Sequence, residues 1–223
     1  MDRFFRYFIG YKKWIASAIM VILIVMVFLI RQAGVGVFSD GFPDSDEMYT
    51  FKYEKEYTSY DIKEITGIDI NWANGVVTLK VSKDLDRIIV TETSANAIPL
   101  NNRLSVDFSG ERLNLKWENE VITLGFFDDS YKNLVVEIPE SMSKGLSAVT
   151  IKNQTGSIYA SGLESEKVRI KTGKGTVDAR YITSSSAEYG SGSGDINLSA
   201  LKSDGLTVRA NKGKILVNDI SAE

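Results

Sequence analysis

A repeat of 19 residues constrains the fold more than any other feature of this sequence. Segments that begin at residues 149, 168, 187 and 206 align without an insertion, and a glycine occupies the same position in each of them. Residues that share a position in the repeat are called a column below. The glycine column and four mostly apolar columns are Gly156, Gly175, Gly194 and Gly213; Ile158, Val177, Ile196 and Ile215; Ala160, Ala179, Leu198 and Val217; Ile151, Ile170, Tyr189 and Val208; and Leu163, Ile182, Leu201 and Ile220.

These columns predict a parallel β-solenoid in which each repeat forms one coil. Apolar residues two apart mark strands with one face inward, and glycine tolerates the backbone conformation of a corner. One coil cannot bury its inward row, whereas coils stacked about 4.8 Å apart share a continuous core. The same alignment places Arg169 beside Glu188 and Asp195 beside Lys214. The alternative, an antiparallel meander of hairpins, has no reason to keep a spacing of 19 residues.

Residues 65–145 are predicted to form an irregular β-rich half that leads into the regular solenoid repeats of residues 146–223. The segment IDINWANGVVTL repeats the glycine and the apolar positions of the coils, with Gly75 at the corner. The segments RIIVTETS, RLSVDFSGERLNLKW and NLVVEIPE have strand patterning, and Ser109 and Gly110 form a predicted hairpin turn. We expect a turn at ESMSKGL and no helix in this part of the chain.

The N-terminal segment predicts a membrane anchor. Residues 14–30 carry no charge and span about 25 Å as a helix, and flanking Lys and Arg side chains cover the shortfall against the bilayer. We therefore expect a short cytoplasmic segment at 1–13 and a transmembrane helix at 14–31. A linker and the first strand of the domain follow at 32–64, and MYTFKYEKEY is a candidate edge strand or membrane-facing aromatic segment. The alternatives are a cleaved signal peptide, which lacks its cleavage site here, and a buried core helix.

Charge sets the predicted orientation and limits the partners. Basic residues precede the apolar segment and acidic residues follow it, so the positive-inside rule predicts an extracellular domain. Five of the 26 basic residues and one of the 29 acidic residues lie within 1–31, which leaves 32–223 with a net charge of −7. Such a domain is a poor candidate for binding nucleic acid through its bulk charge.

The chain contains neither cysteine nor histidine, which removes the thiol nucleophile, the usual general base and the usual transition-metal ligands. Asp178, Arg180 and Asp195 are the candidates for glycosidic chemistry on an outer sheet, against the alternative of a solvated strand face. The segments GSGSGDINL and TGKGT depart from the calcium and phosphate motifs that they partly match. We assign no catalytic, cofactor-binding or metal-ligating residue. Lys171, Arg169 and Arg209 are interpreted as surface charge, and FFDDSY at 126–131 as a capping loop or a contact patch.

The combination of an N-terminal anchor, the IDINWANGVVTL segment, a VVEIP strand and glycine-centred units resembles the bacterial putative-adhesin family, domain of unknown function 4097. The resemblance covers about residues 65 to 220. It implies a surface-facing β-solenoid, sometimes linked to cell-envelope stress systems, and it implies no catalytic residues.

Two functions follow from this sequence. The first is a noncatalytic, membrane-anchored surface protein for adhesion or for binding an envelope polymer or a membrane protein partner, as an accessory of an envelope-stress response. The second is a carbohydrate-active enzyme on a solenoid scaffold.

The last coil ends near Ile220 without an evident cap. We therefore expect either end-to-end self-association through this edge or a C-terminal strand that covers it.

Overall fold

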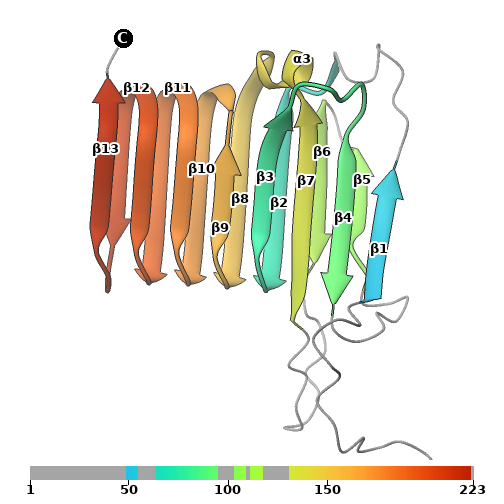
Figure 1. The fold of residues 1–223 in the computed structure, drawn as a ribbon, viewed down its shortest axis with the longest axis horizontal. Coiled ribbons are helices and arrows are strands. Elements are labelled where there is room, and N and C mark those ends of the chain that lie inside the picture. The colour runs from blue at the N-terminus through green and yellow to red at the C-terminus, as the bar shows by residue number, and fades with distance from the viewer. Residues whose placement is uncertain (1–48, 55–63, 95–102, 109–110, 118–130, 222–223) are drawn as a thin grey trace, which may run out of the picture. The chain divides into compact units, whose positions relative to one another are not determined.

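The computed structural model describes residues 49–54, 64–94, 103–108, 111–117 and 131–221, with the backbone alone for 49–54. These residues form one 13-stranded sheet that folds around a single apolar core (Figure 1). They belong to a compact unit that spans Glu47–Glu223. The strands are β1 (Tyr49–Glu54), β2 (Gly67–Asn74), β3 (Val77–Ser82), β4 (Ile89–Ser94), β5 (Ser105–Phe108), β6 (Arg112–Trp117), β7 (Lys132–Pro139), β8 (Leu146–Thr155), β9 (Ile158–Ser161), β10 (Glu164–Lys174), β11 (Val177–Ser193), β12 (Ile196–Ala210) and β13 (Ile215–Ser221), and one short helix, α3 (Glu140–Ser143), precedes β8.

The sheet has two sides, which we call side A and side B. Side A contains β1, β4, β7, β3, β9, the first parts of β11 and β12, and β13. Side B contains β5, β6, β2, β8, β10 and the later parts of β11 and β12. All pairings from β6 and β7 to the C-terminal end are parallel. The expected parallel β-solenoid is therefore confirmed, and the antiparallel meander is wrong for this region.

Chain order and stacking order differ at one point. The coil formed by β2 and β3 lies between β6 and β7 on one flank and β8 and β9 on the other. Antiparallel strands complete the outer flank, where β5 pairs with β6 and β4 pairs with β7 and β1. β1 therefore lies at an edge of the sheet (Figure 1), as predicted for MYTFKYEKEY. The strands predicted between residues 87 and 139 are confirmed. ESMSKGL forms a turn, but the expectation of no helix here is wrong: its first four residues form the short helix α3, which turns Met142 into the core.

Glycine is required at the corner from side B to side A. Gly175 has φ +136°, and a Cβ there would lie 2.3 Å from the carbonyl oxygen of Gly156 in the preceding coil. The corner glycines of the other coils, from Gly75 to Gly213, also have a positive φ, and a Cβ at each of them would lie equally close to a backbone carbonyl group of the neighbouring coil. The backbones of successive coils thus stack directly on one another, which no larger residue permits.

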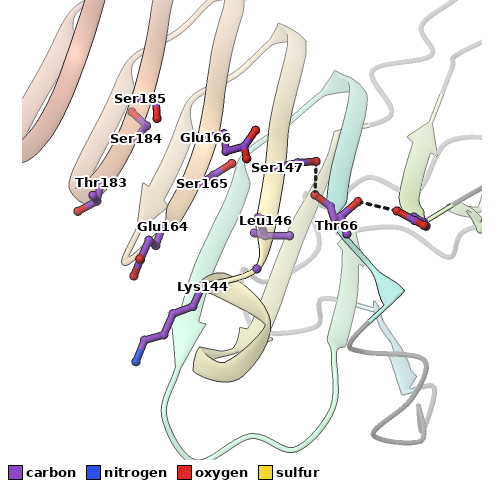
Figure 2. Close-up of a pocket in the computed structure, with 12 residues that line it drawn as sticks. Thr66, Lys144, Leu146, Ser147, Glu164, Ser165, Glu166, Thr183, Ser184 and Ser185 are labelled. Carbon is purple, nitrogen blue, oxygen red and sulfur yellow. Dashed lines mark hydrogen bonds between the residues drawn. The ribbon is translucent and has the colours of Figure 1, made fainter.

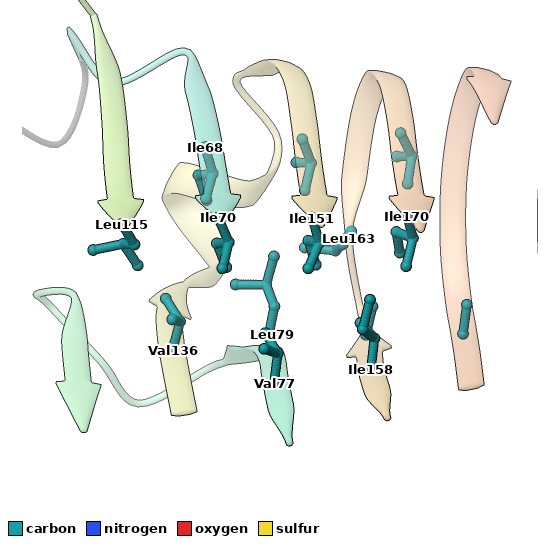
Figure 3. Packing of buried hydrophobic residues seen from close by; sticks show 14 of the residues in the cluster. Ile68, Ile70, Val77, Leu79, Leu115, Val136, Ile151, Ile158, Leu163 and Ile170 are labelled. Atoms are coloured by element: carbon teal, nitrogen blue, oxygen red, sulfur yellow. The ribbon is translucent and has the colours of Figure 1, made fainter. Parts of the chain in front are cut away.

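The predicted columns line the core. Ile158, Val177 and Ile196 are fully buried, and Ile215 of the same column is 46% exposed because no further coil covers it. The other apolar columns show the same pattern and lose their burial only in the last coil. Figure 3 shows Ile151 and Ile170 of side B above Ile158 of side A in this interior, with Leu163 drawn level with Ile151 and Ile170.

One inward column is polar, and its side chains donate hydrogen bonds to the carbonyl oxygens of the corner glycines. The amide of Asn153 donates to the carbonyl oxygen of Gly75 at 2.7 Å, and the hydroxyl of Thr172 donates to that of Gly156 at 2.8 Å. Ser191 repeats the contact one coil later. These bonds satisfy buried carbonyl groups that would otherwise carry a desolvation cost.

The predicted transmembrane helix at 14–31 lies outside the described residues, as do the turn at 109–110 and most of the segment 126–131. In the part of the chain that the structure describes, no helix is both long enough and apolar enough to cross a membrane.

Candidate binding surfaces

A hollow of about 660 Å³ follows the corner that leads from side A back to side B (Figure 2). We call it the corner groove. The starts of β8 and β10, the middle of β11 and the turn after α3 form its walls. Its lining is rich in hydroxyl and carboxylate groups and consists of Thr66, Glu111, Lys144, Gly145, Leu146, Ser147, Glu164, Ser165, Glu166, Thr183, Ser184 and Ser185.

Hydrogen bonds to backbone or side-chain oxygens hold several hydroxyl groups of the corner groove. Ser147 donates to the carbonyl oxygen of Thr66 at 2.9 Å, and Thr66 donates to the carboxylate of Glu111 at 3.3 Å (Figure 2). Ser165 donates to the carbonyl oxygen of Lys167 at 3.1 Å. A serine whose proton is directed at a backbone carbonyl is not activated as a nucleophile. The groove is therefore suited to hydrogen-bonding a polar ligand rather than to attacking one.

A second surface, which we call the basic face, is the outward side of β8, β10 and the later parts of β11 and β12. Residues 150–154 of β8, 167–173 of β10, 186–192 of β11 and 205–209 of β12 hold five basic side chains and one acidic side chain, Glu188. The exposed Glu164, Glu166, Lys202 and Asp204 of these strands precede those ranges, at the corner that leads into side B, and Lys174 follows them. Between the strands lies a hollow of about 250 Å³ over Gly190 and Gly192. The basic side chains are Lys152, Lys167, Arg169, Lys171 and Arg209.

Glu188 is the centre of an ion-pair network on the basic face. Its carboxylate contacts Arg169 at 2.7 Å and Lys171 at 2.5 Å. The hydrogen bond from Lys171 is the main cause that lowers the pKa of Glu188, with the charges of Lys171 and Arg169 acting in the same direction. The predicted pair of Arg169 and Glu188 is confirmed.

The sequence profile of the Toastrack DUF4097 family matches residues 65–223, which is most of the chain. This chain belongs to that family. The assignment agrees with the resemblance noted in the sequence and with the stacked parallel strands.

Solved structures resemble the Toastrack domain in fold. A putative cell adhesion protein from Clostridium sporogenes is 10% identical, with a TM-score of 0.53 over 78% of this chain and 100% of its own. Putative adhesins from Bacteroides fragilis and Parabacteroides distasonis are 13% and 12% identical. The match to the Bacteroides fragilis protein covers 78% of this chain and 98% of that protein's chain, and the match to the Parabacteroides distasonis protein covers 79% and 81%, respectively. Their TM-scores of 0.34 and 0.36 support no further argument. No curated protein is significantly similar in sequence.

The structure pairs two of the three residues considered for glycosidic chemistry with one another and gives the third a different partner. Arg180 binds both carboxylate oxygens of Asp178, at 2.6 and 2.7 Å, and this hydrogen bonding raises the pKa of Arg180. Asp195 lies at the glycine corner instead, where it accepts a hydrogen bond from the backbone N–H of Lys214 at 2.8 Å. Its predicted position beside Lys214 is thus correct, although the contact is with the backbone.

Two features of the Toastrack domain were absent from the sequence interpretation. The corner groove was not predicted, although Ser165, Ser184 and Ser203 share a column and that regularity is visible in the sequence. The basic face was not predicted because its side chains come from four different strands, which are brought side by side only by the stacking of the coils. Among the described residues, no group of three or more acidic side chains is arranged to hold a metal ion.

Proposed function

We propose that this Toastrack protein is a noncatalytic surface protein that is anchored in the cell membrane by residues 14–31 and binds a partner outside the cell. The apolar segment and the charges that flank it support the anchor and its orientation. In this arrangement residues 1–13 are cytoplasmic and the β-solenoid is extracellular. The binding role is adhesion or attachment to an envelope polymer or a membrane protein, as an accessory of the envelope-stress response.

The observation that carries this proposal is the corner groove. It offers hydroxyl and carboxylate groups along several coils, and their backbones are fixed by the stack. Polar groups that converge on a preformed hollow fix the orientation of a ligand, and the polar lining of this groove suits a polar ligand. The structure from Clostridium sporogenes, which has a similar fold, is named a putative cell adhesion protein, and this name supports the same class of role.

A binding assay with isolated envelopes tests this proposal. The full-length protein, purified in a nonionic detergent, should bind envelope material from its own cells and release it chemically unchanged. Substitution of Ser185 and Glu166, which are exposed in the corner groove, by Ala and Gln should weaken binding without changing the thermal stability. Absence of binding to any envelope fraction would contradict the proposal.

The second candidate is a carbohydrate-active enzyme, for which the carboxylate of Asp178 is the residue to examine. Its bidentate pair with Arg180 occupies both carboxylate oxygens, which argues for a structural role. Turnover of envelope glycans that is lost in Asp178→Ala and kept in Asn197→Ala would favour the enzyme.

We also propose self-association through the C-terminal edge. β13 pairs with β12 alone within the described residues, and its large apolar side chains are exposed.

A further inference from the structure

The basic face carries unbalanced charge in a chain that is acidic overall. The whole chain has a net charge of −3. Residues 150–154 of β8, 167–173 of β10, 186–192 of β11 and 205–209 of β12 nevertheless hold five cations against the single carboxylate of Glu188, and the carboxylates of Glu164, Glu166 and Asp204 precede these ranges at the corner. The carboxylate of Glu188 is already occupied by Arg169 and Lys171. Lys152, Lys167 and Arg209 are exposed, and none of them contacts an acidic side chain within the described residues.

Three of these cations lie in one row that crosses four neighbouring strands. Lys152 of β8 is the direct cross-strand partner of Lys171 of β10. Lys171 is followed by Gly190 of β11 and then by Arg209 of β12. With strands about 4.8 Å apart, the row extends over about 14 Å. Like charges on directly adjacent positions destabilise a sheet, so the pair of lysines carries a cost that a bound anion would remove.

The row contains an open position between its cations. Gly190 has no side chain, and its hollow of about 250 Å³ lies between Lys171 and Arg209. Thr207 and Asn211 line the same hollow with a hydroxyl and an amide group. Glu188 also lines the hollow, and its carboxylate is paired with Lys171 and Arg169. An anionic group placed between Lys171 and Arg209 would meet a cation on each side, and neighbouring hydroxyl groups of the ligand would meet hydrogen-bonding side chains.

The arrangement identifies the class of ligand. A small anion can contact one or two of these cations, whereas a linear polymer with one anionic group per unit can follow the whole row. The large exposed apolar side chains of the described domain lie elsewhere, so this face has none to insert into a bilayer. We propose that the basic face binds a linear polyanion, either a polyuronate or a polymer linked by phosphodiesters, along the row Lys152, Lys171, Gly190 and Arg209. That the protein meets such polymers outside the cell rests on the proposed extracellular function. The binding site on the basic face does not depend on that proposal.

Binding of the full-length protein to immobilised polymers tests the inference. Polygalacturonate and poly(glycerol phosphate) represent the two sources of anionic groups, dextran is the neutral control, and phosphatidylglycerol vesicles represent an anionic bilayer. We expect tight binding to at least one polyanion, weak binding to dextran, and a loss of affinity with rising salt because ions screen exposed charges.

Charge reversal locates the site. Arg209→Glu and Lys152→Glu should each lower the affinity for the polyanion by about tenfold, because an attractive contact becomes repulsive. Gly190→Glu should have a similar effect, since its new carboxylate would occupy the hollow; φ at Gly190 is compatible with a side chain. Lys83→Glu is the matched control, because Lys83 is exposed in the turn after β3, away from this face. Arg209→Gln and Lys152→Gln repeat the test with neutral side chains.

Three results would overturn the inference: equal affinity for dextran and the polyanions, reversed variants that bind like the parent, or preferential binding to the vesicles. Envelope binding that is insensitive to Arg209→Glu would refute the basic face and leave the proposed function standing. Polyanion binding that depends on Arg209, without any envelope binding, would support the basic face as a binding site and contradict the proposed function.

Discussion

At the scale of single residues, the glycine corner is the least replaceable part of the fold. Gly175→Ala places a Cβ against the carbonyl oxygen of Gly156 and forces alanine to φ +136°. We expect a loss of about 3 kcal/mol or more in the free energy of unfolding, from backbone strain and overpacking together. Gly205→Ala is the control, because its Cβ would lie 3.6 Å from the nearest atom without a positive φ. Urea denaturation measures both, and a similar small effect at the two positions would refute the backbone stacking.

The inward columns make a second prediction at this scale. Ile196 is fully buried, whereas its neighbour Asn197 is half-buried on the outer side. Ile196→Ala should cost about 2–5 kcal/mol, because it leaves a cavity in the core. Asn197→Ala should change the stability little. Equal effects of the two substitutions, measured by thermal and urea unfolding, would mean that the inward and outward assignments are wrong.

Tyr189 departs from the aliphatic pattern of its column and has a pH-dependent consequence. Its hydroxyl group is buried and has no hydrogen-bond partner among the described residues. Burial raises the pKa of Tyr189 above its ordinary value. The unfolded chain releases this proton near pH 10 and the folded chain does not, so the contribution to stability is complete below that pH and is lost as the pH rises further.

Tyr189→Phe tests this assignment. The substitution removes an unpaired polar group, so the variant should be as stable as the parent at pH 8, or more stable. At pH 11 the parent should lose more stability than the variant. Urea denaturation at the two pH values measures the difference, and a parallel decline of both proteins would show that the hydroxyl group is solvated.

At the scale of elements, a charged pair lies inside the flank opposite β13. Lys132 of β7 and Glu92 of β4 are almost fully buried and contact one another at 2.5 Å. The ammonium group also lies 3.9 Å from the ring centre of Trp117, and Trp72 donates to the carbonyl oxygen of Lys132 at 2.8 Å. The pair thus connects strands of the irregular half through both charge and aromatic contact.

Removing one charge of this pair should lower the free energy of unfolding more than removing both. Lys132→Met leaves the carboxylate of Glu92 buried without its cation, and we expect a loss of about 3–5 kcal/mol. The double variant Lys132→Met with Glu92→Gln should recover part of that loss, because no uncompensated charge remains. Denaturation of the single and double variants measures the coupling. Additive losses would show that the two side chains act independently.

The sequence predicted the coils better than their corners. Apolar columns and the glycine column specify strands and one corner, because burial and positive φ restrict the residue type there. The second corner has φ between +51° and +75° at Gly162, Tyr181, Ala200 and Asp219. A left-handed conformation at mixed residue types leaves no pattern in a sequence, so this corner could not be predicted. The polar inward column of Asn153, Thr172 and Ser191 was overlooked because polar residues are expected to face solvent.

At the scale of the whole domain, the two flanks of the stack are finished differently. Antiparallel strands close the flank at β1 and β5, which limits the open backbone there. The family and the solenoid were predictable because they depend on a repeated interval. The insertion of β2 and β3 between β6 and β8 was not, since it depends on contacts between residues far apart in the chain. The surface sites depend on which coils bring exposed side chains together, and they required the structure.

The C-terminal flank carries the last prediction. All seven residues of β13 are exposed, including Ile215 at 46%, Val217 at 41% and Ile220 at 39%, although their columns are buried in every earlier coil. The later part of β12 is open at the same end on side B. A partner that covers β13 and the later part of β12 at once must present two open strands and an apolar row with the same spacing between them. A second copy of this end, related by a two-fold axis, meets both requirements.

A single introduced thiol can detect that pairing because the natural chain has no cysteine. Leu216 lies near the middle of β13 and is 55% exposed, so Leu216→Cys should form covalent dimers with a short bifunctional maleimide. Adding Val217→Lys should abolish these dimers, because it places a charge in the shared apolar row. Tyr159→Cys, which is 44% exposed on side A away from the edge, should not form them. Cross-linking that persists with Val217→Lys, or a Leu216→Cys protein that stays monomeric, would mean that the edge is not a site of self-association.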